Sequence, residues 1–149
     1  MISLVYPEYP FRMRELEGKR QIFDDTRKRW VAFTPEEWVR QNFLQYLLQG
    51  KKYPASLIAV EKELMLGELT KRFDILVYDH LHRPWMMVEC KSMDVIITDA
   101  VVHQILRYNM AIPVRYMVVT NGTASWFFEK KSGSLELIQE LPGWKVGEQ

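Results

Sequence analysis

Two neighbouring stretches in the middle of the chain carry the alternating pattern of β-strands. In residues 73–79, FDILVYD, the alternation places Asp74, Leu76 and Tyr78 on one face and Phe73, Ile75 and Val77 on the other. In residues 85–91, WMMVECK, Glu89 and Lys91 share one face, whereas Met86, Val88 and Cys90 point to the opposite one. Both strands are otherwise apolar on both faces, which is typical of strands covered on both sides. We therefore expect them to lie side by side within a sheet.

Two other segments have helical spacing. Thr34 at the cap, Pro35 at the first helical position and Glu37 three residues after the cap form a capping box. The apolar positions that follow recur with the period of a helix up to Gly50: Val39, Phe43, Tyr46 and Leu47. A second helix, capped by Asp94 or Thr98, must end before Pro113. Its apolar positions are Val101, Val102, Ile105, Leu106 and Ala111.

The remaining segments predict further strands. Residues 56–66, SLIAVEKELML, read as a strand that carries Glu61 and Glu63, because a helix there would leave the sheet without its first strand. Residues 115–120 form a buried strand, and residues 124–130 and 134–141 form a hairpin through Ser132-Gly133. An irregular or short-hairpin arm over residues 1–33 precedes these elements. The order of elements predicts an α/β domain with a central mixed sheet flanked by helices.

Composition limits the remaining possibilities. A chain of 149 residues with 48% hydrophobic residues is a single domain, 1–149, with ample material for a core. The net charge of +1 means that any DNA-binding face must come from local clustering. Residues 12–29 hold seven Arg and Lys interrupted by four acidic residues. This segment forms either a solvated mixed-charge face, which we favour, or a phosphate-contacting patch.

Cys90 is the single cysteine, which excludes an internal disulfide and a multi-cysteine metal site. Strand alternation turns its side chain away from Glu89 and Lys91, so we expect it in the core and not as a nucleophile. His80 and His82 lie in a polar turn without a third zinc ligand at a normal spacing. No apolar run approaches the roughly 20 residues of a membrane span, and no signal peptide is evident, so we expect a cytoplasmic protein.

Glu89 and Lys91 are two charges at the end of the otherwise apolar strand 85–91, and their partial burial needs compensation. If Asp74 lies opposite Glu89, the two carboxylates offer hard oxygen ligands of the kind that Mg²⁺ accepts while it keeps several waters. Lys91 would then stand beside one of those waters or beside a phosphate. The alternative is a structural salt bridge from Asp74 to Lys71, Arg72 or Lys91.

These residues resemble a known family. Asp74, a strand, and then Glu89-Cys90-Lys91 resemble the PD-(D/E)XK nuclease superfamily. Gln104 and Tyr108, which share one helix face, are similar to the QxxxY element of the branch that holds RecB-type nucleases and the N-terminal nuclease domain of type I restriction R subunits. TPEEWVRQNFLQYL and VVTNG also resemble that domain, and the similarity spans roughly residues 20–130.

The resemblance implies a restriction-endonuclease-like fold and a Mg²⁺-dependent DNA endonuclease, with Mn²⁺ as a possible substitute. In that family pattern Asp74 and Glu89 bind the metal with the backbone carbonyl of Cys90, and Lys91 orients the attacking water or neutralises phosphate charge. Gln104 would bind a phosphate or base, and Tyr108 would hold the site in shape. Related nucleases often place an acidic residue on the first helix near the metal, but the capping box explains Glu37 without chemistry.

Several functional alternatives stay open. The domain could be a catalytically inactive nucleic-acid-binding or interaction module on the same fold. An active enzyme could prefer linear or branched DNA, act as a homodimer, or work with partner restriction-modification subunits. Glu61 or Glu63 could lie beside Asp74. No P-loop GxxxxGK[ST] occurs in the sequence, so we expect no helicase motor in it.

Overall fold

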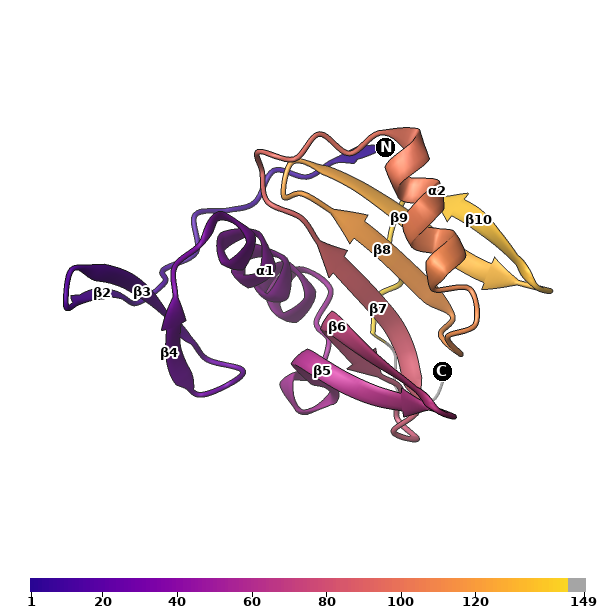
Figure 1. Ribbon diagram of the computed structural model, residues 1–149, viewed down its shortest axis with the longest axis horizontal. Helices are drawn as coiled ribbons and strands as arrows, with labels where there is room; N and C mark the ends of the chain where they lie inside the picture. The colour runs from indigo at the N-terminus through magenta and orange to yellow at the C-terminus, as the bar shows by residue number, and fades with distance from the viewer. Residues whose placement is uncertain (145–149) are drawn as a thin grey trace.

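The computed structural model describes residues 1–144 and contains one large sheet and one small one (Figure 1). The large sheet has seven strands in the order β1-β9-β8-β7-β6-β5, with β10 also paired to β9. Its strands are β1 (Ile2–Ser3), β5 (Ile58–Leu66), β6 (Leu69–Tyr78), β7 (Pro84–Cys90), β8 (Tyr116–Thr120), β9 (Ala124–Lys131) and β10 (Ser134–Ile138). Only β7 and β8 run parallel, so the sheet is mixed, as the sequence predicted.

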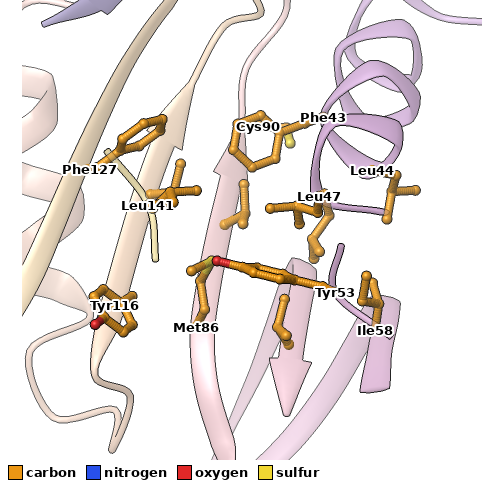
Figure 2. Packing of buried hydrophobic residues seen from close by; sticks show 14 of the residues in the cluster. Phe43, Leu44, Leu47, Tyr53, Ile58, Met86, Cys90, Tyr116, Phe127 and Leu141 are labelled. Atoms are coloured by element: carbon orange, nitrogen blue, oxygen red, sulfur yellow. The ribbon is translucent and has the colours of Figure 1, made fainter. Parts of the chain in front are cut away.

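Two helices cover opposite faces of this sheet. Helix α1 (Pro35–Gln45) continues as a π-helical turn (Tyr46–Gly50), and α2 is formed by Asp99–Tyr108. On the α1 face, Phe43 and Leu47 pack against Met86 and Cys90, as Figure 2 shows. On the α2 face, Val102 and Leu106 pack against strand residues that include Met87. The result is an α/β fold of the restriction-endonuclease type, and none of the described helices is long and apolar enough to cross a membrane.

Local features of the sequence explain both helix starts. Thr34 caps α1 by accepting a hydrogen bond from the backbone N–H of Glu37 at 3.0 Å, and Thr98 caps α2 in the same way through Val101. The capping box was predicted to occupy the Glu37 side chain as well. Instead, that carboxylate accepts hydrogen bonds from the side chains of Arg27, Arg40 and Gln41. Thr34 therefore caps the helix, whereas the Glu37 carboxylate is the acceptor in a buried polar cluster.

The large sheet splits between β6 and β7. The two strands pair from Tyr78–Pro84 to Ile75–Val88 and then separate, while β7 stays paired with β8 as far as Cys90–Thr120. Asp74 and Glu89 are the next residues on the two separating strands. The split creates a fork in the sheet with one carboxylate on each arm.

The predicted alternation fails at two residues of β6. Asp74 was expected to share a face with Leu76 and Tyr78, which pack on the α2 face, but its carboxylate contacts Arg40 of α1. Phe73 was placed on the same face as Ile75, but it packs with Leu76 on the α2 face. Across from Asp74, Glu61 of β5 has a φ of 51°, and the β5–β6 pairing skips this position. The left-handed Glu61 therefore stands outside the ladder, opposite Asp74, whose side chain turns into the fork and accepts the Cys90 N–H.

The small sheet comprises β2 (Met13–Leu16), β3 (Lys19–Asp24) and β4 (Arg29–Ala32), paired antiparallel in that order. It confirms a short hairpin within the N-terminal arm of residues 1–33, and the turn between β2 and β3 contains Gly18, which has a φ of 78°. In Figure 1 the three strands project away from the large sheet beside α1. Residues 145–149 of the predicted single domain lie outside the described residues.

Candidate active site

The Asp74 carboxylate lies in the fork between the strands. Its Oδ2 accepts a hydrogen bond of 2.8 Å from the backbone N–H of Cys90, and its Oδ1 accepts one of 2.9 Å from Nη2 of Arg40. The hydrogen bond from the Cys90 N–H takes the place of a backbone hydrogen bond between β6 and β7, so it links the two strands where their pairing has ended. Arg40 is none of the three ion-pair partners that the sequence suggested for Asp74, which were Lys71, Arg72 and Lys91.

Glu89 and Lys91 project from the other arm of the fork. The Lys91 Nζ lies 3.5 Å from Oε1 of Glu89, which confirms that the two charges share a face. They line an open cavity of about 340 Å³ together with Asp74. Its remaining lining residues are Glu36, Arg40, Glu61, Arg72, Phe73 and Cys90. The structure thus brings together the Asp, Glu and Lys of the predicted set.

Glu89 binds a proton unusually tightly. Burial and the nearby negative charge of Asp74 raise its pKa to about 7, although the Lys91 ammonium acts in the opposite direction. The cavity is lined by four carboxylates, of Glu36, Glu61, Asp74 and Glu89, and by three cations, of Arg40, Arg72 and Lys91, so negative charge is in excess. A site of this kind gains stability from an additional positive charge.

A buried cluster of ion pairs forms the floor beside Asp74. Arg40 on α1 contacts Glu37 at 2.8 Å, and Arg27 from the β3–β4 turn contacts the same Glu37 carboxylate at 2.7 Å. Arg27 also reaches Glu61, at 3.1 Å. Although burial acts to lower the pKa of Arg40, its hydrogen bond to Asp74 and the charge of Glu37 raise it overall. This cluster fixes α1 and the small sheet to the fork.

The structure places the two predicted α2 residues differently. Tyr108 lines a smaller cavity next to Glu89, where its ring packs against the Lys71 ammonium with Nζ 3.0 Å from the ring centroid. Gln104, one turn earlier on the helix, is exposed and does not line either cavity. Glu37 is buried in the ion-pair cluster and does not line the cavity, and Glu63 is exposed. Glu61 does lie beside Asp74, through the cavity that both line.

Comparison with protein families agrees with this arrangement. A family model described as the type I restriction enzyme R protein N terminus matches residues 35–142, well over half of the chain. The chain belongs to this family. No curated protein sequence matches it. The match covers α1, the fork, α2 and the strands up to β10, and it begins after the small sheet.

The R-protein N terminus is a nuclease-related domain whose family typically uses a divalent metal, and the polar groups of the fork suit a hard cation. No group of three His, Cys, Asp or Glu side chains that could hold a metal occurs within residues 1–144. However, the Cys90 N–H points to Asp74, and the N–H and C=O of one strand residue face the same edge. Two carboxylates and one carbonyl, completed by water, are a donor set that Mg²⁺ accepts.

Sequence reasoning missed the arginines of this R-protein domain. Arg40 lies three and four residues after Glu37 and Glu36, a spacing that places the three side chains on one helix face. That spacing could have indicated the Arg40 ion pairs, but not the contact with Asp74, which requires the fold. Arg27 carried no comparable signal, because it lies within a run of mixed charge.

Proposed function

We propose that the domain hydrolyses phosphodiester bonds of DNA with a divalent cation, Mg²⁺ or Mn²⁺, held by Asp74, Glu89 and the backbone carbonyl of Cys90. The observation that carries the proposal is the charge imbalance of the cavity. Asp74 and Glu89 line the same cavity at the fork, and burial, followed by the repulsion from the Asp74 carboxylate, raises the pKa of Glu89 to about 7. A bound cation would remove that repulsion and keep Glu89 ionised at neutral pH.

The residues of the cavity have distinct tasks. Asp74, anchored by the Cys90 N–H, fixes the position of the site relative to both strands. The Lys91 ammonium is partly exposed at the cavity and can donate to a phosphate oxygen, where it stabilises the negative charge that develops as the bond breaks. The cation would lower the pKa of a water and polarise the phosphodiester. Tyr108 keeps Lys71 beside the neighbouring cavity, so that α2 closes one side of the site.

A non-catalytic DNA-binding module is the second candidate, and one contact favours it. Arg40 already gives Asp74 a positive partner at 2.9 Å, and a guanidinium at that carboxylate competes with a metal ion. The Nε of Arg40 is buried without a hydrogen-bond partner among the described residues, so the guanidinium is incompletely satisfied where it stands. In the catalytic proposal Arg40 remains hydrogen bonded to Oδ1 and leaves the second lone pairs of Asp74 to the cation.

A plasmid-nicking assay separates the two candidates. Wild-type protein with Mg²⁺ or Mn²⁺ is expected to nick or linearise supercoiled DNA, and EDTA is expected to abolish the reaction. Asp74→Ala and Lys91→Ala should lose cleavage, whereas Lys131→Ala, an exposed lysine two residues after another glutamate, should retain it. Equal residual activity in wild type and both site variants would point to a contaminant and retire the catalytic proposal.

A further inference from the structure

The small sheet has two chemically different faces. Residues directly opposite each other in antiparallel strands share a face, so the β2–β3–β4 register assigns each side chain to one side. Ile22 and Asp24 are fully buried and define the inner face. Residues of the outer face are Arg12, Arg14, Leu16, Lys19, Gln21, Phe23, Trp30 and Ala32.

Arginines stack on aromatic rings across the outer face. The Arg12 guanidinium lies 3.8 Å from the ring centroid of Phe23, and that of Arg14 lies 4.4 Å from the ring centroid of Trp30. The two rings contact each other edge to face at 5.3 Å between centroids. Stacking holds each guanidinium flat against its ring. The Arg14 Nε donates a hydrogen bond of 2.6 Å to Oε1 of Gln21, so its Nη groups are the ones that can donate to an anion. Both arginines are exposed.

The outer face is positive although the whole chain is nearly neutral. The register places Arg12, Arg14 and Lys19 on this face and puts Glu15 and Asp24 on the inner one. Asp25, in the β3–β4 turn, approaches Arg12 only to 3.8 Å, and both side chains are well exposed. Three cations and no strand carboxylate therefore face outward, which is the charge complement of a nucleic-acid backbone.

The small sheet is joined to the fork by ion pairs. Arg27 in the β3–β4 turn forms ion pairs with Glu37 and Glu61, and Glu61 also lines the cavity of Asp74. An open trough of about 680 Å³ runs along β4, lined by Arg29, Trp30 and neighbouring residues. The trough and the cavity share Glu36, Arg40 and Glu61 as lining residues. A duplex at the cavity could thus continue past β4 to the outer face.

We propose that the outer face of the β2–β3–β4 sheet binds the phosphate backbone of duplex DNA, with Arg12 and Arg14 as the principal contacts and Lys19 beside them. The family match begins at residue 35, so this surface lies outside the matched residues. The proposal goes beyond cleavage. It concerns affinity, which can be measured in the absence of any metal.

The test is DNA binding in EDTA, measured by fluorescence anisotropy with a labelled 30-base-pair duplex over a series of KCl concentrations. Arg12→Gln/Arg14→Gln should weaken binding on the order of tenfold, and the slope of log K against log[salt] should become shallower by about 0.9 for each phosphate that the variant no longer neutralises. Arg107→Gln/Lys131→Gln removes two exposed cations from the opposite end of the chain and should leave affinity and slope close to those of wild type.

A conservative pair of variants separates charge from folding. Arg12→Lys/Arg14→Lys keeps both charges and should retain most of the salt slope. Circular dichroism should give all three double variants the wild-type spectrum, because the substituted side chains are exposed. Equal slopes for wild type and Arg12→Gln/Arg14→Gln would overturn the proposal, and so would an equal loss in Arg107→Gln/Lys131→Gln. Neither result depends on whether the fork cleaves DNA.

Discussion

Two Glu-X-Lys triplets lie in the same sheet with nearly the same local geometry. Glu89-Cys90-Lys91 ends β7, and Glu129-Lys130-Lys131 ends β9. In both, the lysine Nζ is 3.5 Å from Oε1 of the glutamate two residues earlier. Their electrostatic surroundings are nevertheless opposite.

The difference comes from the third group at each triplet. Glu129 also contacts the guanidinium of Arg115, at 3.0 Å and 2.9 Å. Burial acts to raise the pKa of Glu129, but the Arg115 hydrogen bond and the Lys131 charge lower it below its ordinary value. Among the residues that the structure describes, Glu89 has no such guanidinium partner, and burial, followed by the charge of the Asp74 carboxylate, raises its pKa to about 7. One triplet is a satisfied ion pair, and the other has an excess of negative charge.

The comparison shows why a Glu-X-Lys triplet alone identifies no active site. A carboxylate whose neighbours balance its charge contributes to the fold, whereas one placed beside a like charge has a reason to bind a cation. Each substitution of Glu89 or Lys91 therefore has a matched control, the same substitution of Glu129 or Lys131.

The largest difference between the two triplets is expected in the rate of DNA cleavage. Glu89→Gln removes one of the two proposed carboxylate ligands and should reduce the rate of plasmid nicking with Mg²⁺ by about 10²–10³-fold, the usual effect of losing one electrostatic stabiliser at a reacting phosphate. Glu129→Gln should stay within about twofold of wild type. Comparable losses in both variants would mean that the β7 triplet has no special role.

The sequence was sufficient for the elements that depend on local patterns. The helix cap at Thr34, the short hairpin within residues 1–33 and the strand that carries Glu89 follow from periodicity and turn chemistry over a few residues. For the second helix the sequence left Asp94 and Thr98 open as caps, and the structure has Thr98. The resemblance to restriction R subunits, based on the order of Asp74, Glu89 and Lys91, is confirmed by the family match. The site roles of Gln104, Tyr108 and Glu37 stay predictions.

The fork itself could not be predicted from the sequence. The fork begins where the pairing of β6 and β7 ends, after Ile75 and Val88, and the left-handed Glu61 lies opposite Asp74 on β5. The contact between Arg40 and Asp74 spans 34 positions along the chain. Such features arise from long-range packing, and no window of local sequence contains both partners.

The second contrast concerns metal binding measured by thermal unfolding. A divalent ion at 100 times its dissociation constant should stabilise the wild type by about 2.7 kcal/mol, and this gain should increase between pH 6 and pH 8 as Glu89 loses its proton. Glu129→Gln should show the same gain, whereas Glu89→Gln should lose most of it. An equal shift of the melting temperature in all three proteins would place the ion elsewhere.

The third contrast is in the stability of the metal-free protein. The pKa of Glu89 rises from 4.5 to about 7 on folding, so the stability that its proton contributes is complete below pH 4.5 and is lost as the pH rises through 7. At pH 8, Glu89→Gln should therefore raise the free energy of unfolding by about 2 kcal/mol, allowing for solvent screening of its partly exposed side chain.

Glu129→Gln is expected to have the opposite effect. It removes a carboxylate that Arg115 stabilises and should lower the free energy of unfolding by about 1 kcal/mol. Urea denaturation of the two variants and the wild type in EDTA at pH 5 and pH 8 measures both effects. A loss of stability in Glu89→Gln at pH 8 would contradict the charge imbalance proposed for the fork.

The smallest contrast separates the two lysines. Because the Lys91 charge lowers the pKa of Glu89, Lys91→Gln should move that pKa further upward, with an effect below about 1 kcal/mol for a partly exposed ion pair. Lys131→Gln should leave the pKa of Glu129 below its ordinary value, since Arg115 remains in contact. Carboxyl-carbon NMR titrations of the two variants report each glutamate directly. An unchanged Glu89 titration in Lys91→Gln would show that the ammonium 3.5 Å away is too well solvated to influence the carboxylate, and Lys91 would then have to act on the phosphate alone.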